Sequence, residues 1–299
     1  MNRKGNLVAV FEPISLQRQD EYLQRLSLSS ISASDYSFVN LWGWAKEYGL
    51  CWSWSNDLIW IRQSWPEHVF WAPVGLWQGI EWEEALAGLG EPEAVFSRVP
   101  HDLMEIWKNR FAERVEIQEA RDQWDYVYSV DDLVSLRGNR YHKKKNLLNQ
   151  FRKKYSYEYL DMSMDLTGKI LAMQQRWCEW RDCESSELLA AENRAVERLL
   201  GSWNRLRNVT GGALFVDGRE AAFCLAEQFS PEMLIIHAEK GFPEYSGVYQ
   251  AINQMFLSAH REAPLVNRQQ DLGEEGMRKA KMSYHPVDFI RKYRIRFIR

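Results

Sequence analysis

Residues 213–239 read ALFVDGREAAFCLAEQFSPEMLIIHAE, and this stretch indicates the fold class more clearly than any other part of the chain. Two apolar runs, Ala213–Val216 and Ala221–Glu227, flank Asp217-Gly218, a dipeptide that is typical of a β-hairpin. A third apolar run, Met233–Glu239, follows after a few polar residues and has the composition of a strand. The stretch therefore predicts three consecutive strands.

Helices and strands are predicted on both sides of these strands from the apolar periodicity. In the same half of the chain we expect helices over 141–155, 166–181, 187–206, 247–262 and 274–283, and strands over 157–160, 264–268 and 288–297. In the first half we expect strands over 8–14, 51–54, 58–62, 69–72, 94–99 and 115–119, and helices over 17–26, 37–48, 82–88 and 101–111. The same order of elements occurs twice, which predicts two copies of one mixed α/β unit.

The composition shifts near the middle of the chain. Hydrophobic residues make up 45 % and charged residues 26 % of the 299 residues, which is typical of a soluble globular protein and excludes collagen-like and disordered classes. Residues 1–130 carry 11 basic and 19 acidic side chains, whereas residues 131–299 carry 27 and 22. Eleven of the 14 tryptophans also precede residue 130, where we expect them to fill the core. We therefore predict domains over 1–130 and 131–299.

No apolar run approaches the roughly 20 residues that span a bilayer, and the N-terminal apolar stretch is too short for a signal peptide. We therefore expect a cytoplasmic protein without a transmembrane segment. The spacing of Cys51, Cys178, Cys183 and Cys224 fits no zinc motif, so free and mostly buried thiols are expected. Histidines and carboxylates show no metal-ligand spacing, and no metal site is predicted.

The repeated order of elements resembles the N-acetyltransferase (GNAT) fold, a mixed sheet with helices on both faces. Two copies in one chain resemble the Fem-type aminoacyl transferases and the C-terminal half of phosphatidylglycerol lysyltransferase. Residues 276–286, GMRKAKMSYHP, are similar to the Gly-Leu-Arg-x-x-Lys-x-x-Phe-x-Pro run of the lysyltransferase family. Residues 34–41, 141–146 and 267–273 resemble a related family of uncharacterised soluble proteins.

This resemblance implies an acyltransferase, and three functions are open. The first is transfer of an aminoacyl group from aminoacyl-tRNA to a small-molecule or lipid-linked acceptor. The second is a coenzyme A-dependent N-acyltransferase that uses an acyl-coenzyme A. The third is a binding protein that keeps the fold without the chemistry. The resemblance implies no bound cofactor beyond these co-substrates.

The GNAT resemblance places the substrate where the sheet opens after the strand 233–239. Glu239 ends this strand and Asp271 follows the next one, so both are candidates for the base that deprotonates the acceptor. Gly247 begins the following helix, whose free N–H groups can hold a phosphate. The neighbouring Glu244 and Tyr249 replace the basic or amide residue and the small residue of the acetyltransferase loop, which disfavours coenzyme A.

Basic residues are the candidate substrate-binding groups. Arg278 and Lys281 lie three apart on one predicted helix and share a face, where they are expected to bind the phosphates of the acyl carrier. Asn267, at the end of the strand before them, joins this group. Residues 137–154 hold eight basic side chains and no acid. Within this run an RNA acceptor stem is the expected ligand of Lys143, Lys144, Lys145 and Arg152; the alternative is a solvated helix face.

Overall fold

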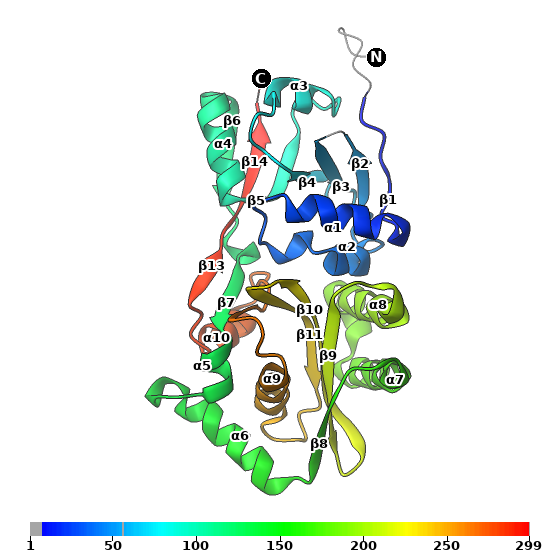
Figure 1. Ribbon diagram of the computed structural model, residues 1–299, viewed down its shortest axis with the longest axis vertical. Coiled ribbons are helices and arrows are strands. Elements are labelled where there is room, and N and C mark those ends of the chain that lie inside the picture. The colour runs from blue at the N-terminus through cyan, green and yellow to red at the C-terminus, as the bar shows by residue number, and fades with distance from the viewer. Residues whose placement is uncertain (1–7, 56, 299) are drawn as a thin grey trace. The chain divides into compact units, whose positions relative to one another are not determined.

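The computed structural model describes residues 8–55 and 57–298, which form two compact units (Figure 1). The first unit is Met1–Trp124 together with Ile290–Arg299, and the second is Asp125–Phe289. Each unit contains one seven-stranded sheet that combines antiparallel pairs with a parallel pair near its middle. The expected mixed α/β fold class is confirmed.

The first unit has the strand order β1-β2-β3-β4-β5-β14-β6. Its strands are β1 (Glu12–Pro13), β2 (Cys51–Trp54), β3 (Leu58–Gln63), β4 (Val69–Gly75), β5 (Val95–Pro100), β6 (Val115–Glu119) and β14 (Lys292–Phe297). Its helices are α1 (Gln19–Ser27), α2 (Phe38–Trp44), α3 (Trp82–Ala87) and α4 (His101–Phe111), and a short 3-10 helix, η2 (Ser34–Tyr36), precedes α2. Trp52, Trp71 and Trp107 are completely buried, so these tryptophans fill the core as expected.

The second unit has the strand order β13-β7-β12-β11-β10-β9-β8. Its strands are β7 (Asp125–Ser129), β8 (Tyr157–Asp161), β9 (Val209–Val216), β10 (Arg219–Ser230), β11 (Met233–Gly241), β12 (Leu265–Asn267) and β13 (Asp288–Ile290). Its helices are α5 (Val130–Ser135), α6 (His142–Lys154), α7 (Met164–Arg181), α8 (Glu187–Gly201), α9 (Val248–Ala259) and α10 (Glu275–Met282). The hairpin at Asp217-Gly218 joins β9 to β10 as predicted, and β11 follows.

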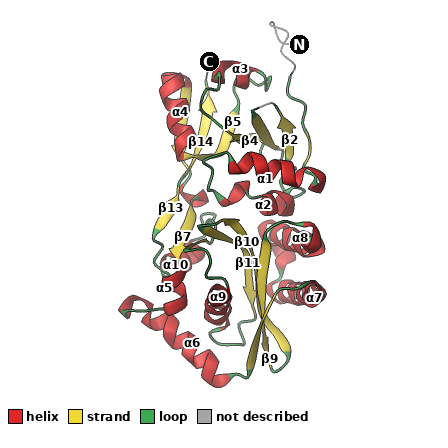
Figure 2. Cartoon of the chain, in the orientation of Figure 1, coloured by secondary structure: helices red, strands yellow, loops and turns green. Residues whose placement is uncertain are grey.

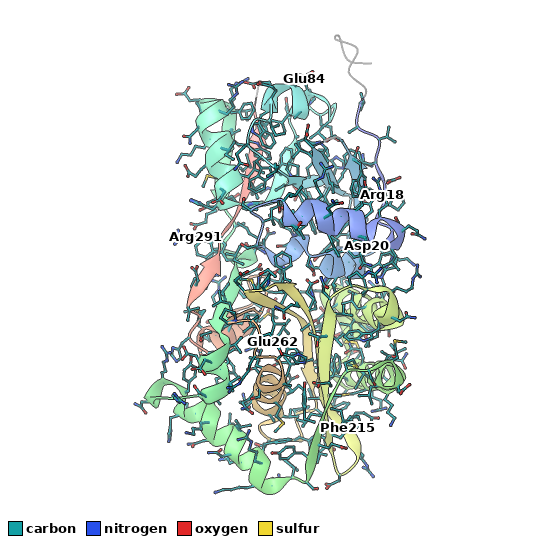
Figure 3. All side chains as sticks on the ribbon, viewed as in Figure 1. Arg18, Asp20, Glu84, Phe215, Glu262 and Arg291 are labelled. Atoms are coloured by element: carbon teal, nitrogen blue, oxygen red, sulfur yellow. A yellow bond between two sulfur atoms is a disulfide. The ribbon has the colours of Figure 1, made fainter. Side chains whose placement is uncertain are left out.

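Alternate side chains along the central strands of the second sheet point to opposite faces and build two cores. Leu214 and Val216 pack on one face with residues of α5, α6 and α9. Ala213 and Phe215 pack on the other face with residues of α7 and α8. Figure 2 shows these helices on the two sides of the sheet, and Figure 3 draws the side chains between them, with Phe215 labelled.

Two strands join the sheet of the other half of the chain. β7 follows β6 in sequence but pairs with β12 in the second sheet. β14 follows β13 but inserts between β5 and β6 in the first sheet. β14 thus pairs with the edge of β5, and β7 pairs with the edge of β12. Each edge would otherwise be left unpaired by the half of the chain that contains β5 or β12. The division therefore differs from the boundary expected at residue 130, and the single strand expected over 288–297 is two strands in two sheets.

The cysteines differ from the sequence expectation. Cys178, near the end of α7, forms a disulfide with Cys183, whereas Cys51 and Cys224 are free thiols. The two bonded cysteines are buried with Trp177, and Leu189 and Phe242 pack against them. The prediction of four free thiols was therefore wrong. The tight turn after α7 brings two cysteines that are five residues apart into bonding distance.

Candidate functional site

The candidate site lies in the second unit, where two parallel strands separate. β11 and β12 pair only at Met233↔Leu265, Leu234↔Val266 and Ile235↔Asn267. Beyond these pairs β11 continues to Gly241, while the chain after Asn267 stays with β7, since the Arg268 N–H donates to the Tyr126 carbonyl at 2.9 Å. The two strands therefore diverge after Ile235 and Asn267, at the end of β11 that sequence analysis favoured.

Side chains, instead of backbone hydrogen bonds, connect the diverging strands. Glu239 Oε1 accepts from Arg268 Nη2, and its Oε2 accepts from Asn253 Nδ2 of α9, both at 3.2 Å. Its side chain is only 9 % exposed. A carboxylate has about four acceptor positions, so Glu239 keeps room for a further donor. Of the two predicted bases, Glu239 lies where the strands diverge and keeps free acceptor capacity.

Asp271, the other predicted base, is fully engaged. Its buried carboxylate accepts from the Tyr126 hydroxyl at 2.5 Å, the Gly273 N–H at 2.9 Å and Arg278 Nε at 2.9 Å. Burial would raise the pKa of Asp271, but the hydrogen bonds from Arg278, Tyr126 and Gly273 outweigh it and lower the pKa to about 2. Such a carboxylate is a poor proton acceptor at neutral pH, and Arg278 is its ion-pair partner.

Lys281 is partly buried, and its ammonium group binds backbone carbonyls. Its Nζ donates to the carbonyls of Arg268, at 2.5 Å, and Gln269, at 3.2 Å. Burial, helped by the nearby charge of Arg268, lowers the pKa of Lys281 to about 7. Arg278 and Lys281 therefore both stabilise the segment after β12, instead of pointing side by side toward a ligand.

Arg268 is the most central cation of the site. Its guanidinium carbon lies 5.0 Å from the centre of the Tyr284 ring and 5.8 Å from that of Tyr128. Lys144 approaches the same Tyr284 ring, with Nζ at 4.1 Å from its centre. Burial and, to a lesser degree, the charge of Arg268 lower the pKa of Lys144. The structure thus brings one of the predicted lysines of 143–145 to Arg268.

Gly247 precedes α9 and is packed against α6. Its φ of +85° is a left-handed conformation, and a Cβ there would lie 2.4 Å from the Leu147 carbonyl oxygen. The loop before it is also tied to α6, because the Ser246 N–H donates to the Tyr155 hydroxyl at 3.2 Å. Close packing against α6 therefore explains why this residue is a glycine. The Ser246 N–H, which an acetyltransferase-like loop would offer to a phosphate, is already bonded to Tyr155.

The remaining predicted residues divide into one buried residue and an exposed group. Asn267 is completely buried, donates to Asp125 at 3.0 Å and accepts from the Gln269 N–H at 2.7 Å, so it shapes the turn after β12. Lys143, Lys145 and Arg152 are exposed on α6, where Arg152 donates to Gln254 of α9 at 2.8 Å.

Sequence analysis missed Arg268, Tyr284 and Asn253 as members of the site. A signal for Arg268 exists in the repeat. Ser97-Arg98 and Asn267-Arg268 lie at corresponding places in the two halves, where the parallel pairing of each sheet ends. Tyr284 and Asn253 carry no such signal. Tyr284 follows α10 and meets Arg268, and Asn253 lies on α9 and meets Glu239, only in the folded unit.

Comparisons with known proteins agree with the family resemblance. A family model described as "Phosphatidylglycerol lysyltransferase, C-terminal" matches residues 27–296. An uncharacterised protein of Mycoplasmoides gallisepticum is 25 % identical over 181 residues, which are 58 % of this chain and 56 % of that protein. The match thus spans little more than half the length of that relative.

Solved structures share the fold over nearly the whole chain. A conserved protein of unknown function from Bacteroides thetaiotaomicron superposes with a TM-score of 0.89 at 28 % identity, covering 97 % of this chain and 100 % of that one. L-PGS from Bacillus licheniformis superposes with a TM-score of 0.66 at 12 % identity, covering 97 % and 93 %, which shows a common fold. Among the described residues, no helix combines the length and apolar composition needed to cross a membrane.

Proposed function

We propose a function for this chain on the basis of its family. The chain belongs to the phosphatidylglycerol lysyltransferase C-terminal family, whose model matches residues 27–296. Family and fold support an acyl- or aminoacyltransferase. We propose that the chain moves an aminoacyl group from aminoacyl-tRNA to the amine or hydroxyl of a small or lipid-linked acceptor. The observation that carries the proposal is Glu239, a nearly buried carboxylate where β11 and β12 diverge.

Glu239 acts as the general base in this proposal. The acceptor gives its proton to a Glu239 oxygen while its nitrogen or oxygen bonds to the ester carbonyl carbon. The tetrahedral intermediate then releases the ribose oxygen of the RNA, which takes the proton back from Glu239. Arg268 and Asn253 hold the carboxylate from two sides and fix its orientation. The reaction therefore needs no other proton carrier.

The exposed cations of α6 are proposed to contact the RNA. Lys143 and Lys145 lie in its first turn, and Arg152, Lys153 and Lys154 lie in its last turn. A helix of 13 residues is about 20 Å long, so the two groups can reach phosphates several nucleotides apart. Coenzyme A remains the alternative carrier, but the packing of Gly247 against Leu147 and the use of the Ser246 N–H by Tyr155 argue against it.

A transfer assay tests the proposal. The full chain is incubated with tRNA charged with radiolabelled lysine or alanine, together with phosphatidylglycerol vesicles or a small-molecule extract, and label is followed from RNA to product. We expect transfer by the natural chain and a loss of about 100-fold or more in Glu239→Gln, because the amide cannot accept the proton.

The matched control is Glu262→Gln, which removes an exposed carboxylate of the same unit, labelled in Figure 3. It should transfer like the natural chain. Transfer from acetyl-coenzyme A but from no charged tRNA would replace the proposal with the coenzyme A alternative. Equal rates for Glu239→Gln and the natural chain would exclude Glu239 as the base.

A further inference from the structure

We propose that Lys144 and Arg268 form a receptor for a phosphate group of the acyl donor, beside the base Glu239. This inference rests on the proposed function for the identity of the donor, whereas the receptor itself is argued from side-chain contacts within the second unit.

The first observation is an unmet hydrogen-bonding group on Arg268. Its Nη2 donates to Glu239, but its Nη1 is buried and has no hydrogen-bond partner among the described residues. A buried guanidinium N–H without an acceptor is costly, and an oxyanion is its best partner. The Arg268 side chain keeps 15 % of its surface exposed, although Nη1 itself is buried.

The second observation is a cation close to Arg268 that has no anionic partner among the described residues. Lys144 Nζ and the Arg268 guanidinium carbon lie 4.1 Å and 5.0 Å from the centre of one ring, that of Tyr284. The two cationic groups therefore lie no more than about 9 Å apart, and their charges interact, since the charge of Arg268 lowers the pKa of Lys144. Within residues 8–55 and 57–298, Lys144 makes no ion pair. Lys144, and Arg268 through its Nη1, can thus bind the same kind of partner, an oxyanion.

The helix that carries Lys144 adds to the positive potential. Lys144 lies in the first turn of α6, at the positive end of the helix dipole. First turns usually carry acids, but this one carries His142 and three lysines and no acid. Lys143 and Lys145 are exposed, whereas Lys144 is half-buried against Tyr284. A lysine ammonium is unfavourable at the positive end of a helix unless an anion is nearby, so this arrangement favours a bound anion.

The first unit shows what completes such a pair. Arg98 follows the last parallel pair of its sheet, Trp71↔Ser97, as Arg268 follows Ile235↔Asn267. The Arg98 Nε donates to Asp35 at 2.8 Å, and Lys292 donates to the other oxygen of the same carboxylate. One oxyanion thus bonds an arginine and a lysine there. In the second unit the chain supplies no such anion between Lys144 and Arg268.

The ligand chemistry is a phosphate, and the continuing line of exposed cations on α6 favours a nucleotide source over a lipid headgroup. Adenosine 5′-monophosphate mimics the terminal nucleotide of the RNA, and glycerol 1-phosphate mimics a headgroup. Calorimetric titration of the full chain with each probe should show tighter binding of the nucleotide. Lys144→Ala should weaken that binding about 10-fold or more, the loss of one charge-assisted hydrogen bond.

Lys145→Ala is the matched control, because it removes an exposed lysine of the same turn and should change the affinity less than about 3-fold. A second readout is the pKa of Lys144 in an NMR titration, which should rise when the nucleotide binds because an anion stabilises the ammonium.

Equal binding by the natural chain and Lys144→Ala, or equal losses in both variants, would overturn the receptor. Tighter binding of glycerol 1-phosphate would overturn the assignment to the RNA donor. Nucleotide binding that depends on Lys144, in a chain that transfers no aminoacyl group, would support the receptor and contradict only the proposed function.

Discussion

Arg98 and Arg268 occupy the same position in two separate sheets, directly after the last residue of the parallel pair. Arg98 is neutralised by Asp35, which also binds Lys292, and its Nη1 donates to Gln63 at 3.2 Å. Arg268 binds Glu239 through one nitrogen and leaves the other without a partner. The two halves thus share one arginine position. In the first unit the chain's own side chains bind the guanidinium, whereas in the second unit one nitrogen of the guanidinium has no partner among the described residues.

Replacing Asp35 should destabilise the first unit strongly. Asp35→Asn leaves the buried cations Arg98 and Lys292 without their carboxylate, and we expect a loss of about 3–5 kcal/mol in the free energy of unfolding. Lys292→Met should cost less, because the Arg98–Asp35 pair stays neutral. Urea unfolding of both variants measures the difference. A smaller effect of Asp35→Asn than of Lys292→Met would contradict this account.

Asp271 should make stability fall in acid. Its pKa of about 2 in the folded chain is below the value near 3.8 of an unpaired aspartate, so the unfolded chain binds the proton first. Its contribution is complete above pH 4 and is lost as the pH falls toward 2. After allowance for screening at the exposed Arg278, it amounts to about 1 kcal/mol. Asp271→Asn should flatten this part of the stability curve; an unchanged curve would argue against the pairing.

Lys281 should affect the stability of the chain at alkaline pH, in contrast to Asp271. Its pKa of about 7 in the folded chain is below the value near 10.5 of an unfolded lysine. The unfolded chain therefore binds more protons between pH 7 and 10.5, and this group's contribution to stability increases with pH there by about 1 kcal/mol per unit.

In Lys281→Met this rise should disappear, as measured by urea unfolding at pH 7, 8 and 9. The exposed Lys279, which pairs with Glu275 on the same helix, provides the control Lys279→Met, which should keep the rise. If both variants behave alike, the burial of Lys281 is not the cause.

Gly247→Ala should destabilise the second unit by about 2 kcal/mol or more, because alanine is strained at φ +85° and its Cβ would meet the Leu147 carbonyl oxygen. Gly276→Ala is the control: no atom lies within 4 Å of the added Cβ, and the residue is in α10. That substitution should be neutral or stabilise by up to about 1 kcal/mol. Thermal unfolding compares the two, and a tolerated Gly247→Ala would show that α6 can move away.

Much of the local structure could be predicted from the sequence. The Asp217-Gly218 hairpin and the helix around 142–154 depend on neighbours in sequence or on simple apolar patterns. The strand 125–129 was missed, and the strand expected over 8–14 is only Glu12–Pro13 among the described residues. Both errors concern edge or inserted strands, whose pairing partners are distant in sequence.

The sequence by itself determined the α/β class, the doubled order of elements and the family, and it predicted the neighbourhood of the proposed site at the end of β11. Tertiary structure alone decided which cations meet which anions. Asp35 and Lys292 are 257 residues apart and Glu239 and Arg268 are 29 apart, so no local pattern records either pair. Burial then fixed their roles: Lys281 and Asp271 form hydrogen bonds within the protein and support the segment after β12, while Arg268 and Lys144 keep the capacity to bind a ligand.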